Sequence, residues 1–367
     1  MGTDIDDLEG RARLGDGEAQ LSLASRLESQ GDQRLARGWY ARAAEGGNVA
    51  GLRSLAIHLL THEPIVHGDG VNMIRAAAEK GDAQAAYVCG MLAAQDQNLA
   101  SRWQIARECV EIAAQRGWVP AREQLAFLGS DSREVEMIEE APVSSVSAAA
   151  RIGVIEGFAG PAICDWLIDR ARPRLERSGH AGQVRSDHLI DRARPRLERA
   201  MVYDQETGRG RTEGARSNSS IAFDIAQSDL VLMLLRARIA AVAQLPLTSL
   251  ETPTVLHYAP GQQFEPHFDF LDPNVPGYAH DLASNGQRIA TFLLYLNDNF
   301  EGGETDFPAI GFRYRGKKGD ALLFWNVTPD GEPDGQTMHA GLATTRGEKW
   351  LLSQWLRQPV CSSDDSS

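Results

Sequence analysis

Two side chains able to bind a metal ion stand one residue apart in the stretch LHYAPGQQFEPHFDF, residues 256–270. They are His267 and Asp269, and on a β-strand residues i and i+2 point to the same face. The phenylalanines around them favour a strand. The best third ligand is His339, about seventy residues later. Two imidazoles and one carboxylate leave coordination positions open and suit Fe(II); Zn²⁺ could use the same atoms, but no thiolate accompanies them.

Four stretches of the chain resemble the prolyl 4-hydroxylase branch of the Fe(II)/2-oxoglutarate dioxygenases. They are HYAPGQQFEPHFD, RIATFLLYLNDNFEGGETDFP, GKKGDALLFWN and HAGLATTRGEKWLLSQWLR, in the family's order and at its spacing. The resemblance covers residues 151–358 and identifies this part as the dioxygenase domain. Short β-like runs separated by turn signals such as GKKGD and EGGE predict a double-stranded β-helix, or jelly roll, with flanking helices.

The resemblance implies a role for each polar residue of the site. His267, Asp269 and His339 would hold Fe(II), and Lys349 would pair with the distal carboxylate of 2-oxoglutarate. A lysine buried in a barrel needs such an anionic partner, because an isolated buried charge is costly.

Further residues match family positions that contact the cosubstrate or line its pocket. These are Tyr258, Thr291, Tyr295 and Trp355. The chain departs from the family at Ala343 and Thr344, where Pro-Val is common. That departure concerns the rigidity of the turn and leaves the expected ligands unchanged.

The reaction implied by the resemblance is hydroxylation of a prolyl residue in a protein or peptide. O₂ and 2-oxoglutarate would be consumed, succinate and CO₂ released, and L-ascorbate would restore oxidised iron. One alternative keeps these cofactors but acts on another residue or a free amino acid, since substrate choice depends on loops such as 204–220 and 270–287. Another alternative is a partner-binding scaffold with an inactive oxygenase domain.

Residues 1–130 are rich in alanine and leucine, with the apolar spacing of helices. Related stretches begin at Gly15, Gly47, Gly81 and Gly117, 32 to 36 residues apart, which is the range of two-helix solenoid repeats. The block resembles Sel1-like repeats, which are relatives of tetratricopeptide repeats. We therefore expect an α+β protein of two domains, whose all-α N-terminal solenoid offers a surface for the substrate or another protein partner. A helical scaffold or dimerisation surface without a specific ligand is the alternative.

Three histidines, His58, His62 and His67, lie close together in this block. No cysteine or acidic ligand pattern beside them completes a metal site. We interpret them as ordinary helix-end and loop histidines.

An identical segment, LIDRARPRLER, occurs at 167–177 and again at 189–199. Identity over eleven residues indicates a recent tandem duplication. The fold has one place for this helix, so one copy is expected to be surplus and to extend over the surface. The composition of residues 131–150, acidic and then rich in serine and alanine, predicts a linker. Residues 359–367 are expected to be a disordered tail.

The formal net charge of −13 argues against a nucleic-acid or anionic-membrane partner. The N-terminal stretch has no apolar signal region, and no apolar run reaches the length of a transmembrane helix. The four cysteines (Cys89, Cys109, Cys164 and Cys361) are widely spaced. That spacing predicts reduced thiols and a cytoplasmic protein.

Overall fold

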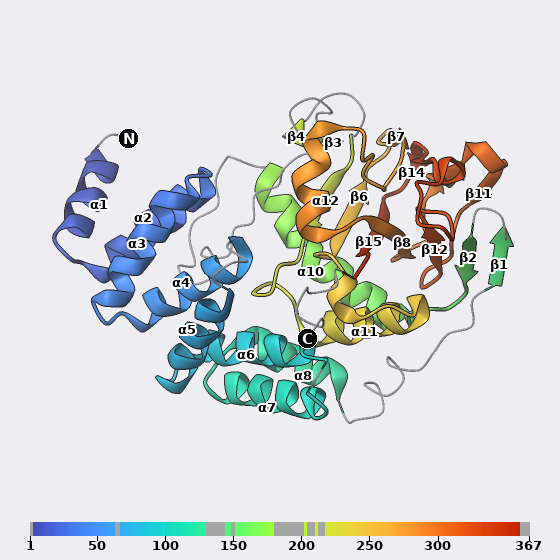
Figure 1. The fold of residues 1–367 in the computed structure, drawn as a ribbon. Coiled ribbons are helices and arrows are strands. Elements are labelled where there is room, and N and C mark those ends of the chain that lie inside the picture. The colour runs from blue at the N-terminus through green and yellow to red at the C-terminus, as the bar shows by residue number, and fades with distance from the viewer. Residues whose placement is uncertain are drawn as a thin grey trace, which may run out of the picture. The chain divides into compact units, whose positions relative to one another are not determined.

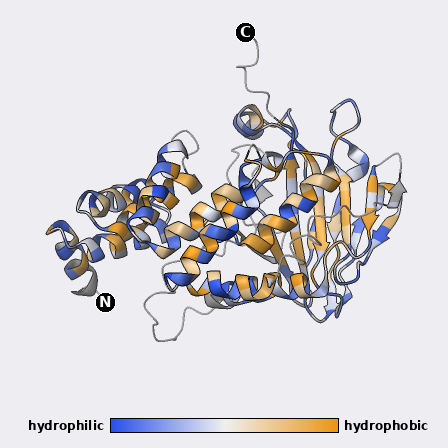
Figure 2. Ribbon diagram, turned by 90° about the horizontal axis from the view of Figure 1, so that it is seen from below, coloured by the Kyte–Doolittle hydropathy of each residue, from blue (hydrophilic) through white to orange (hydrophobic). Residues whose placement is uncertain are grey.

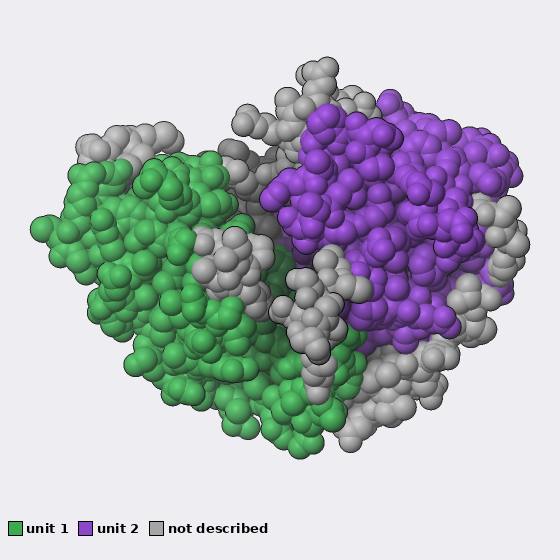
Figure 3. All heavy atoms as spheres, in the orientation of Figure 1, with its two compact units in different colours: residues 1–135, 184–196, 224–233 green, residues 136–183, 197–223, 234–367 purple. Residues whose placement is uncertain are grey.

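The computed structural model describes residues 3–62, 67–97, 99–129, 144–147, 151–179, 202–203, 210–211 and 217–359. The described residues form two compact units, which Figure 3 colours separately: residues 3–129 with 224–233 in one, and residues 144–179, 202–223 and 234–359 in the other. The second copy of the duplicated segment, residues 189–199, lies outside the described residues. So do most of the expected linker, most of the 204–220 loop, and residues 360–367 of the expected tail.

The first unit is helical. Its helices are α1 (Thr3–Arg13), α2 (Gly17–Ser29), α3 (Gln33–Glu45), α4 (Val49–His62), α5 (His67–Glu79), α6 (Ala83–Gln95), α7 (Arg102–Gln115) and α8 (Val119–Leu128). Each helix packs on the next one along the chain (Figure 1). The expected all-α N-terminal region is therefore confirmed.

A glycine in the left-handed region precedes every second helix. These glycines are Gly15, Gly47, Gly81 and Gly117, with φ between 81° and 94°. Residues with a Cβ adopt this φ only at a cost, so glycine ends one helix and allows the chain to turn into the next. Asp16, Asn48 and Asp82 follow three of these glycines and accept hydrogen bonds from backbone N–H groups of the next helix. The sequence repeat is thus a repeat of helix ends and helix caps.

Residues 224–233 belong to the helical unit, although about ninety-five residues of the chain separate them from α8. The Tyr87 hydroxyl donates to the Ser228 carbonyl over 2.9 Å. The buried Gln124 Oε1 accepts the backbone N–H of Leu230, the first residue of α11 (Leu230–Ala243), over 2.8 Å. A side chain of α8 therefore satisfies one of the unpaired N–H groups at the start of α11.

The second unit is built mainly of antiparallel strands. Its elements are β1 (Ser144–Ser147), β2 (Ile152–Ile155), α10 (Pro161–Gly179), β3 (Val202–Tyr203), β4 (Gly210–Arg211), β5 (Ser219–Ala222), β6 (Thr254–Tyr258), β7 (Phe264–His267), α12 (Ala279–Asn285), β8 (Arg288–Tyr295), β9 (Glu301–Gly302), β10 (Thr305–Phe307), β11 (Phe312–Tyr314), β12 (Ala321–Trp325), β13 (His339–Gly341), β14 (Thr344–Arg346) and β15 (Lys349–Arg357). A seven-stranded sheet has the order β1-β2-β12-β8-β15-β6-β5, and a four-stranded sheet has the order β11-β10-β13-β7.

The core of this unit draws side chains from both sheets. Leu256, Leu293 and Leu351 come from the large sheet, and Phe307 comes from the small one. Figure 2 shows the predominantly hydrophobic colouring of the strands that enclose this core. Two antiparallel sheets packed around one apolar core form the expected double-stranded β-helix.

The first copy of the duplicated segment occupies α10. Leu167 and Ala171 are buried on one face of this helix, while Arg172 reaches Glu348 at the surface over 3.1 Å. This copy therefore has the apolar face that packing requires. Among the described residues, no helix is both long enough and apolar enough to cross a bilayer.

One carboxylate, that of Glu251 just before β6, links β8 and β15 at an end of the large sheet. Glu251 accepts hydrogen bonds from Arg288 Nε over 2.7 Å and from Arg357 Nε over 2.5 Å. Both arginine side chains are largely buried, and the Arg288 guanidinium lies 3.7 Å from the ring centroid of Trp355.

We predict that Glu251→Ala lowers the free energy of unfolding by about 3 kcal/mol, because it removes the carboxylate that two buried guanidinium groups share, although Arg357 keeps its second carboxylate partner, Asp281. Glu301→Ala is the matched control: its pair with Arg346 is exposed, and its loss costs less than about 1 kcal/mol. Urea denaturation of both variants measures the difference, and equal losses would contradict the prediction.

Candidate metal centre and cosubstrate site

Neighbouring strands of the small sheet bring the predicted ligands together. β7 and β13 are antiparallel, and His267 is the register partner of His339. Their ring centroids lie 4.3 Å apart. Asp269 follows two residues after His267, and one ligand atom from each of the three residues lies within 4.8 Å of the other two. The three side chains therefore surround one point, as the sequence predicts.

Backbone carbonyls orient both imidazoles. His267 Nδ1 lies 2.8 Å from the Glu265 carbonyl, and His339 Nδ1 lies 3.1 Å from the Thr337 carbonyl. A carbonyl oxygen can only accept, so each Nδ1 carries a proton, and in the neutral imidazole each Nε2 then has a lone pair for a metal. The Nε2 atoms lie 3.6 and 3.5 Å from the Asp269 carboxylate oxygens, which is longer than an ordinary hydrogen bond. This spacing and this donor set fit a single divalent ion.

The Asp269 carboxylate is buried and is held by a chain of hydrogen bonds. Thr291 Oγ1 donates to Asp269 Oδ2 over 2.7 Å, and Asn326 Nδ2 donates to Thr291 Oγ1 over 3.0 Å. Burial by itself raises the pKa of Asp269, but His339, His267 and the Thr291 hydrogen bond outweigh burial and lower the pKa. Asp269 is therefore ionised, as a metal ligand must be.

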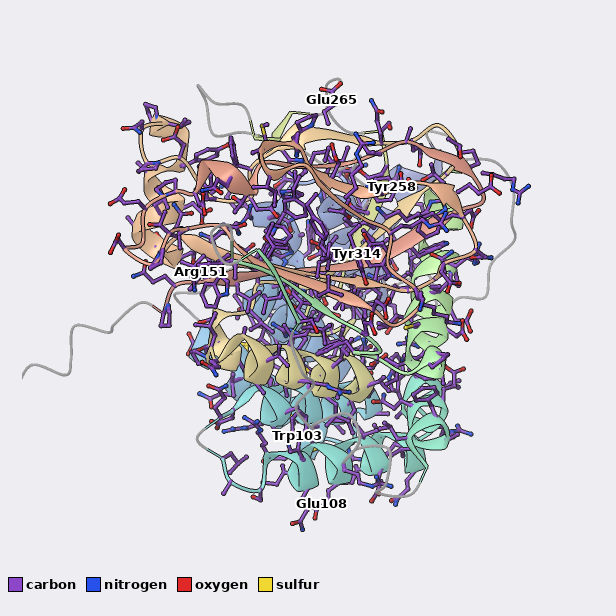
Figure 4. All side chains as sticks on the ribbon, turned by 90° about the vertical axis from the view of Figure 1, so that its right-hand side faces the viewer. Trp103, Glu108, Arg151, Tyr258, Glu265 and Tyr314 are labelled. Carbon is purple, nitrogen blue, oxygen red and sulfur yellow. The ribbon has the colours of Figure 1, made fainter. Side chains whose placement is uncertain are left out.

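Lys349 is also a buried charged residue of this unit, with 1% of its surface exposed. Its Nζ donates to the Gly303 carbonyl over 2.6 Å. Nζ also lies 5.1 and 5.5 Å from the ring centroids of Tyr258 and Tyr295. Burial lowers the pKa of Lys349 to about 7, against a smaller opposing effect of Glu304. Figure 4 shows Tyr258 within the strand-rich unit.

The hydroxyl of Thr344 and the stem of Lys349 both approach Gly303. A methyl group added to the α-carbon of Gly303 would stand 3.1 Å from Thr344 Oγ1 and 3.3 Å from Lys349 Cδ. Thr344 is fully buried, and its Oγ1 has no hydrogen-bond partner among the described residues. A buried unpaired hydroxyl is costly, so this arrangement fits a ligand that accepts hydrogen bonds. An ammonium and a hydroxyl are together suited to the distal carboxylate of 2-oxoglutarate.

The predicted pocket residues divide into two groups. Tyr258 and Tyr295 flank Lys349, and the Tyr295 hydroxyl bonds to Thr305 Oγ1 over 2.7 Å. Trp355 lies six residues after Lys349 on β15, and its register partner on β8 is Thr291. Contact of all four residues with the cosubstrate stays a prediction; in this structure Thr291 donates its hydroxyl to Asp269.

Sequence reasoning missed three residues of this arrangement: Asn326, Gly303 and Thr344. Asn326 ends the motif GKKGDALLFWN, but nothing in that motif indicates a bond to Thr291. Gly303 has a φ of 68° and supplies the carbonyl that holds Lys349. For Thr344 a signal existed, since the residue departs from the Pro-Val pattern, but the sequence suggested only a change in turn rigidity.

Comparison with known proteins decides the family. The model of the 2OG-Fe(II) oxygenase superfamily matches residues 253–357. Prolyl 4-hydroxylase 1 of Arabidopsis thaliana is 32% identical over 231 residues, which cover 59% of this chain and 72% of the relative. Probable prolyl 4-hydroxylase 10 of the same plant is 36% identical over 246 residues, covering 62% and 75%. The chain belongs to the prolyl 4-hydroxylase family.

Solved structures of prolyl 4-hydroxylases are also similar to this chain. The viral collagen prolyl hydroxylase from Paramecium Bursaria Chlorella virus-1, in its 2OG complex, matches 59% of this chain and 100% of its own, with 24% identity and a TM-score of 0.40. Family membership itself rests on the sequence relatives, and the arrangement of the metal ligands rests on the geometry of this chain.

We predict that Thr291→Val weakens divalent-metal binding by about tenfold, because losing a hydrogen bond that orients a ligating carboxylate typically costs 10- to 100-fold in metal affinity. Anaerobic titration of the metal-free protein with Fe(II) or Co²⁺ measures the change. Thr252→Val, at an exposed threonine, is the control. Unchanged affinity in Thr291→Val would show that Asp269 does not depend on this bond.

Proposed function

We propose that this protein is an Fe(II)- and 2-oxoglutarate-dependent dioxygenase that hydroxylates a prolyl residue of a protein or peptide. The observation that carries the proposal is the convergence of His267, Asp269 and His339 in the same unit as the buried Lys349, in a chain that belongs to the prolyl 4-hydroxylase family. Fe(II), 2-oxoglutarate and O₂ bound at this site would supply the oxidant that attacks an unactivated C–H bond.

The residues of the chain bind, orient and shield the reactants. His267, Asp269 and His339 would hold Fe(II), and the Thr291 hydroxyl would keep the Asp269 carboxylate in place. Lys349 and Thr344 would bind the distal carboxylate of 2-oxoglutarate. Phe307 and Phe324 are fully buried, with ring centroids 5.7 and 4.8 Å from that of His339, and they exclude water from one side of the site.

The decisive experiment measures succinate formed from 2-oxoglutarate by the full chain with Fe(II), O₂ and proline-containing peptides. We expect turnover coupled to the gain of one oxygen atom by the peptide, which mass spectrometry detects. Peptides with alanine in place of proline should not be oxidised. His267→Ala is the inactive control, and wild-type turnover no greater than that of this variant would refute the proposal. Oxidation of a residue other than proline would refute the substrate assignment alone.

The finer parts of the proposal rest on the sequence. The helical unit has the repeat length of Sel1-like repeats and glycines at the helix ends. We propose that it holds the protein substrate or another partner. L-ascorbate would keep the iron reduced, and we place the enzyme in the cytoplasm with Cys89, Cys109 and Cys164 as free thiols. If the helical unit holds the protein substrate, altering its binding surface should raise the KM for that protein and leave the KM for a short peptide unchanged.

We predict that Thr344→Val weakens 2-oxoglutarate binding by about fivefold to tenfold, because the variant keeps the shape of the side chain and loses one hydrogen bond to the carboxylate. Anaerobic titration of the Fe(II) enzyme with 2-oxoglutarate gives the affinity directly. Thr345→Val changes the exposed neighbour and serves as the control. Wild-type affinity in Thr344→Val would remove this residue from the cosubstrate site.

We predict that 2-oxoglutarate affinity falls as pH rises above about 7. The pKa of Lys349 in the ligand-free enzyme is lowered to about 7, so above this pH the amine must take up a proton before it pairs with the carboxylate. The loss approaches tenfold per pH unit until the pKa of Lys349 in the complex is reached. Calorimetry between pH 6.5 and 9 measures both the affinity and the proton uptake. Lys349→Arg stays charged throughout this range, so its affinity should not vary with pH.

A further inference from the structure

A second group of two histidines and one carboxylate lies in the helical unit, apart from the proposed catalytic residues. Glu28 is near the end of α2, and His58 and His62 are one turn apart on α4. Glu28 Oε1 lies 2.8 Å from His58 Nδ1 and 3.8 Å from His62 Nε2. One ligand atom from each residue lies within 4.8 Å of the other two. The acidic ligand that the neighbouring sequence lacks therefore comes from a helix thirty positions earlier.

A third helix fixes the carboxylate. The Tyr40 hydroxyl, from α3, donates to Glu28 Oε2 over 3.0 Å, which leaves Oε1 facing the two histidines. Metal ligands are commonly oriented in this way by an outer hydrogen bond. Tyr40 also belongs to the apolar core shared by α2, α3 and α4, so the carboxylate is anchored to a packed part of the unit.

The spacing of the two histidines suits shared coordination. Residues i and i+4 lie on one face of a helix, and the ring centroids of His58 and His62 are 4.9 Å apart. At metal–ligand distances of about 2.1 Å, tetrahedral ligand atoms stand roughly 3.4 Å apart. The 3.8 Å between Glu28 Oε1 and His62 Nε2 is close to this value, whereas the 2.8 Å hydrogen bond between Glu28 Oε1 and His58 Nδ1 must lengthen, with loss of its proton, when an ion binds. The Tyr40–Glu28–His58 hydrogen bonds would satisfy the buried His58 without an ion. The additional feature of this group is the imidazole of His62, whose Nε2 lies 3.8 Å from the same Glu28 oxygen.

We propose that Glu28, His58 and His62 bind a divalent transition-metal ion of the Zn²⁺ class. Two nitrogens and one carboxylate oxygen are a known ligand set for zinc, with a fourth position left for water. His58 is buried, whereas the side chains of Glu28 and His62 are each about one third exposed, so solvent and an ion can reach the site. The ion joins α2 to α4, and hence the first helical repeat to the second. This proposal does not depend on the proposed catalytic function.

The test uses the full chain with His267→Ala and His339→Ala, which removes the imidazoles of the proposed catalytic centre. Co²⁺ is the probe because its visible absorption reports bound nitrogen and oxygen ligands. We expect one Co²⁺ per chain in this background, displaced by Zn²⁺. Adding His62→Ala or the isosteric Glu28→Gln should weaken Co²⁺ binding at least tenfold. Adding His280→Ala, which changes an exposed histidine in the other unit, should leave binding unchanged.

Thermal unfolding gives a second readout. Zn²⁺ should raise the unfolding temperature of the background chain and leave that of its His62→Ala variant unchanged, because an ion that binds only the folded state stabilises it. Failure of the background chain to bind Co²⁺ would overturn the proposal. Equal Co²⁺ affinity with and without His62→Ala and Glu28→Gln would overturn it too, since the three residues would then form a hydrogen-bonded cluster only.

Discussion

The Asp269 carboxylate, held ionised between two β-sheets, is the constraint on which the site depends. An ionised carboxylate without partners is strongly disfavoured in such a place. Thr291 satisfies one oxygen, and the two imidazoles lie just beyond hydrogen-bonding distance. The residual negative charge and the inward-facing Nε2 atoms are the environment that a divalent cation neutralises. The pairing of β7 with β13 supplies that environment, since it places His267 directly opposite His339.

Lys349 is a buried positive charge in the same unit. Its ammonium is buried between tyrosine rings with the Gly303 carbonyl as an acceptor, and its lowered pKa expresses the cost of that burial. The nearby Thr344 hydroxyl has no acceptor among the described residues. A dianionic cosubstrate, as proposed above, would resolve both, because one carboxylate would accept from the ammonium and from the hydroxyl. Binding energy at this end of the ligand would then orient its other end toward the metal.

The helical unit is organised by how its helices begin and end. Its regularity comes from local chemistry, in which a left-handed glycine ends one helix and an Asp or Asn side chain caps the next. Such a pattern tolerates variation elsewhere in each repeat, which explains why the copies have diverged while their boundaries have not. Glu28, His58 and His62 are not part of this pattern, and two successive helix pairs must stack before the three side chains meet.

By itself, the sequence determined the features that short-range geometry encodes. The period of two in a strand placed His267 and Asp269 on one face, and the recurring glycines marked the helix ends. Only the tertiary structure decided which side chains support them. Thr291 reaches Asp269 across 22 positions and Asn326 reaches Thr291 across 35. No local periodicity specifies such contacts, because they depend on the register of strands and the stacking of helices that are distant in the chain.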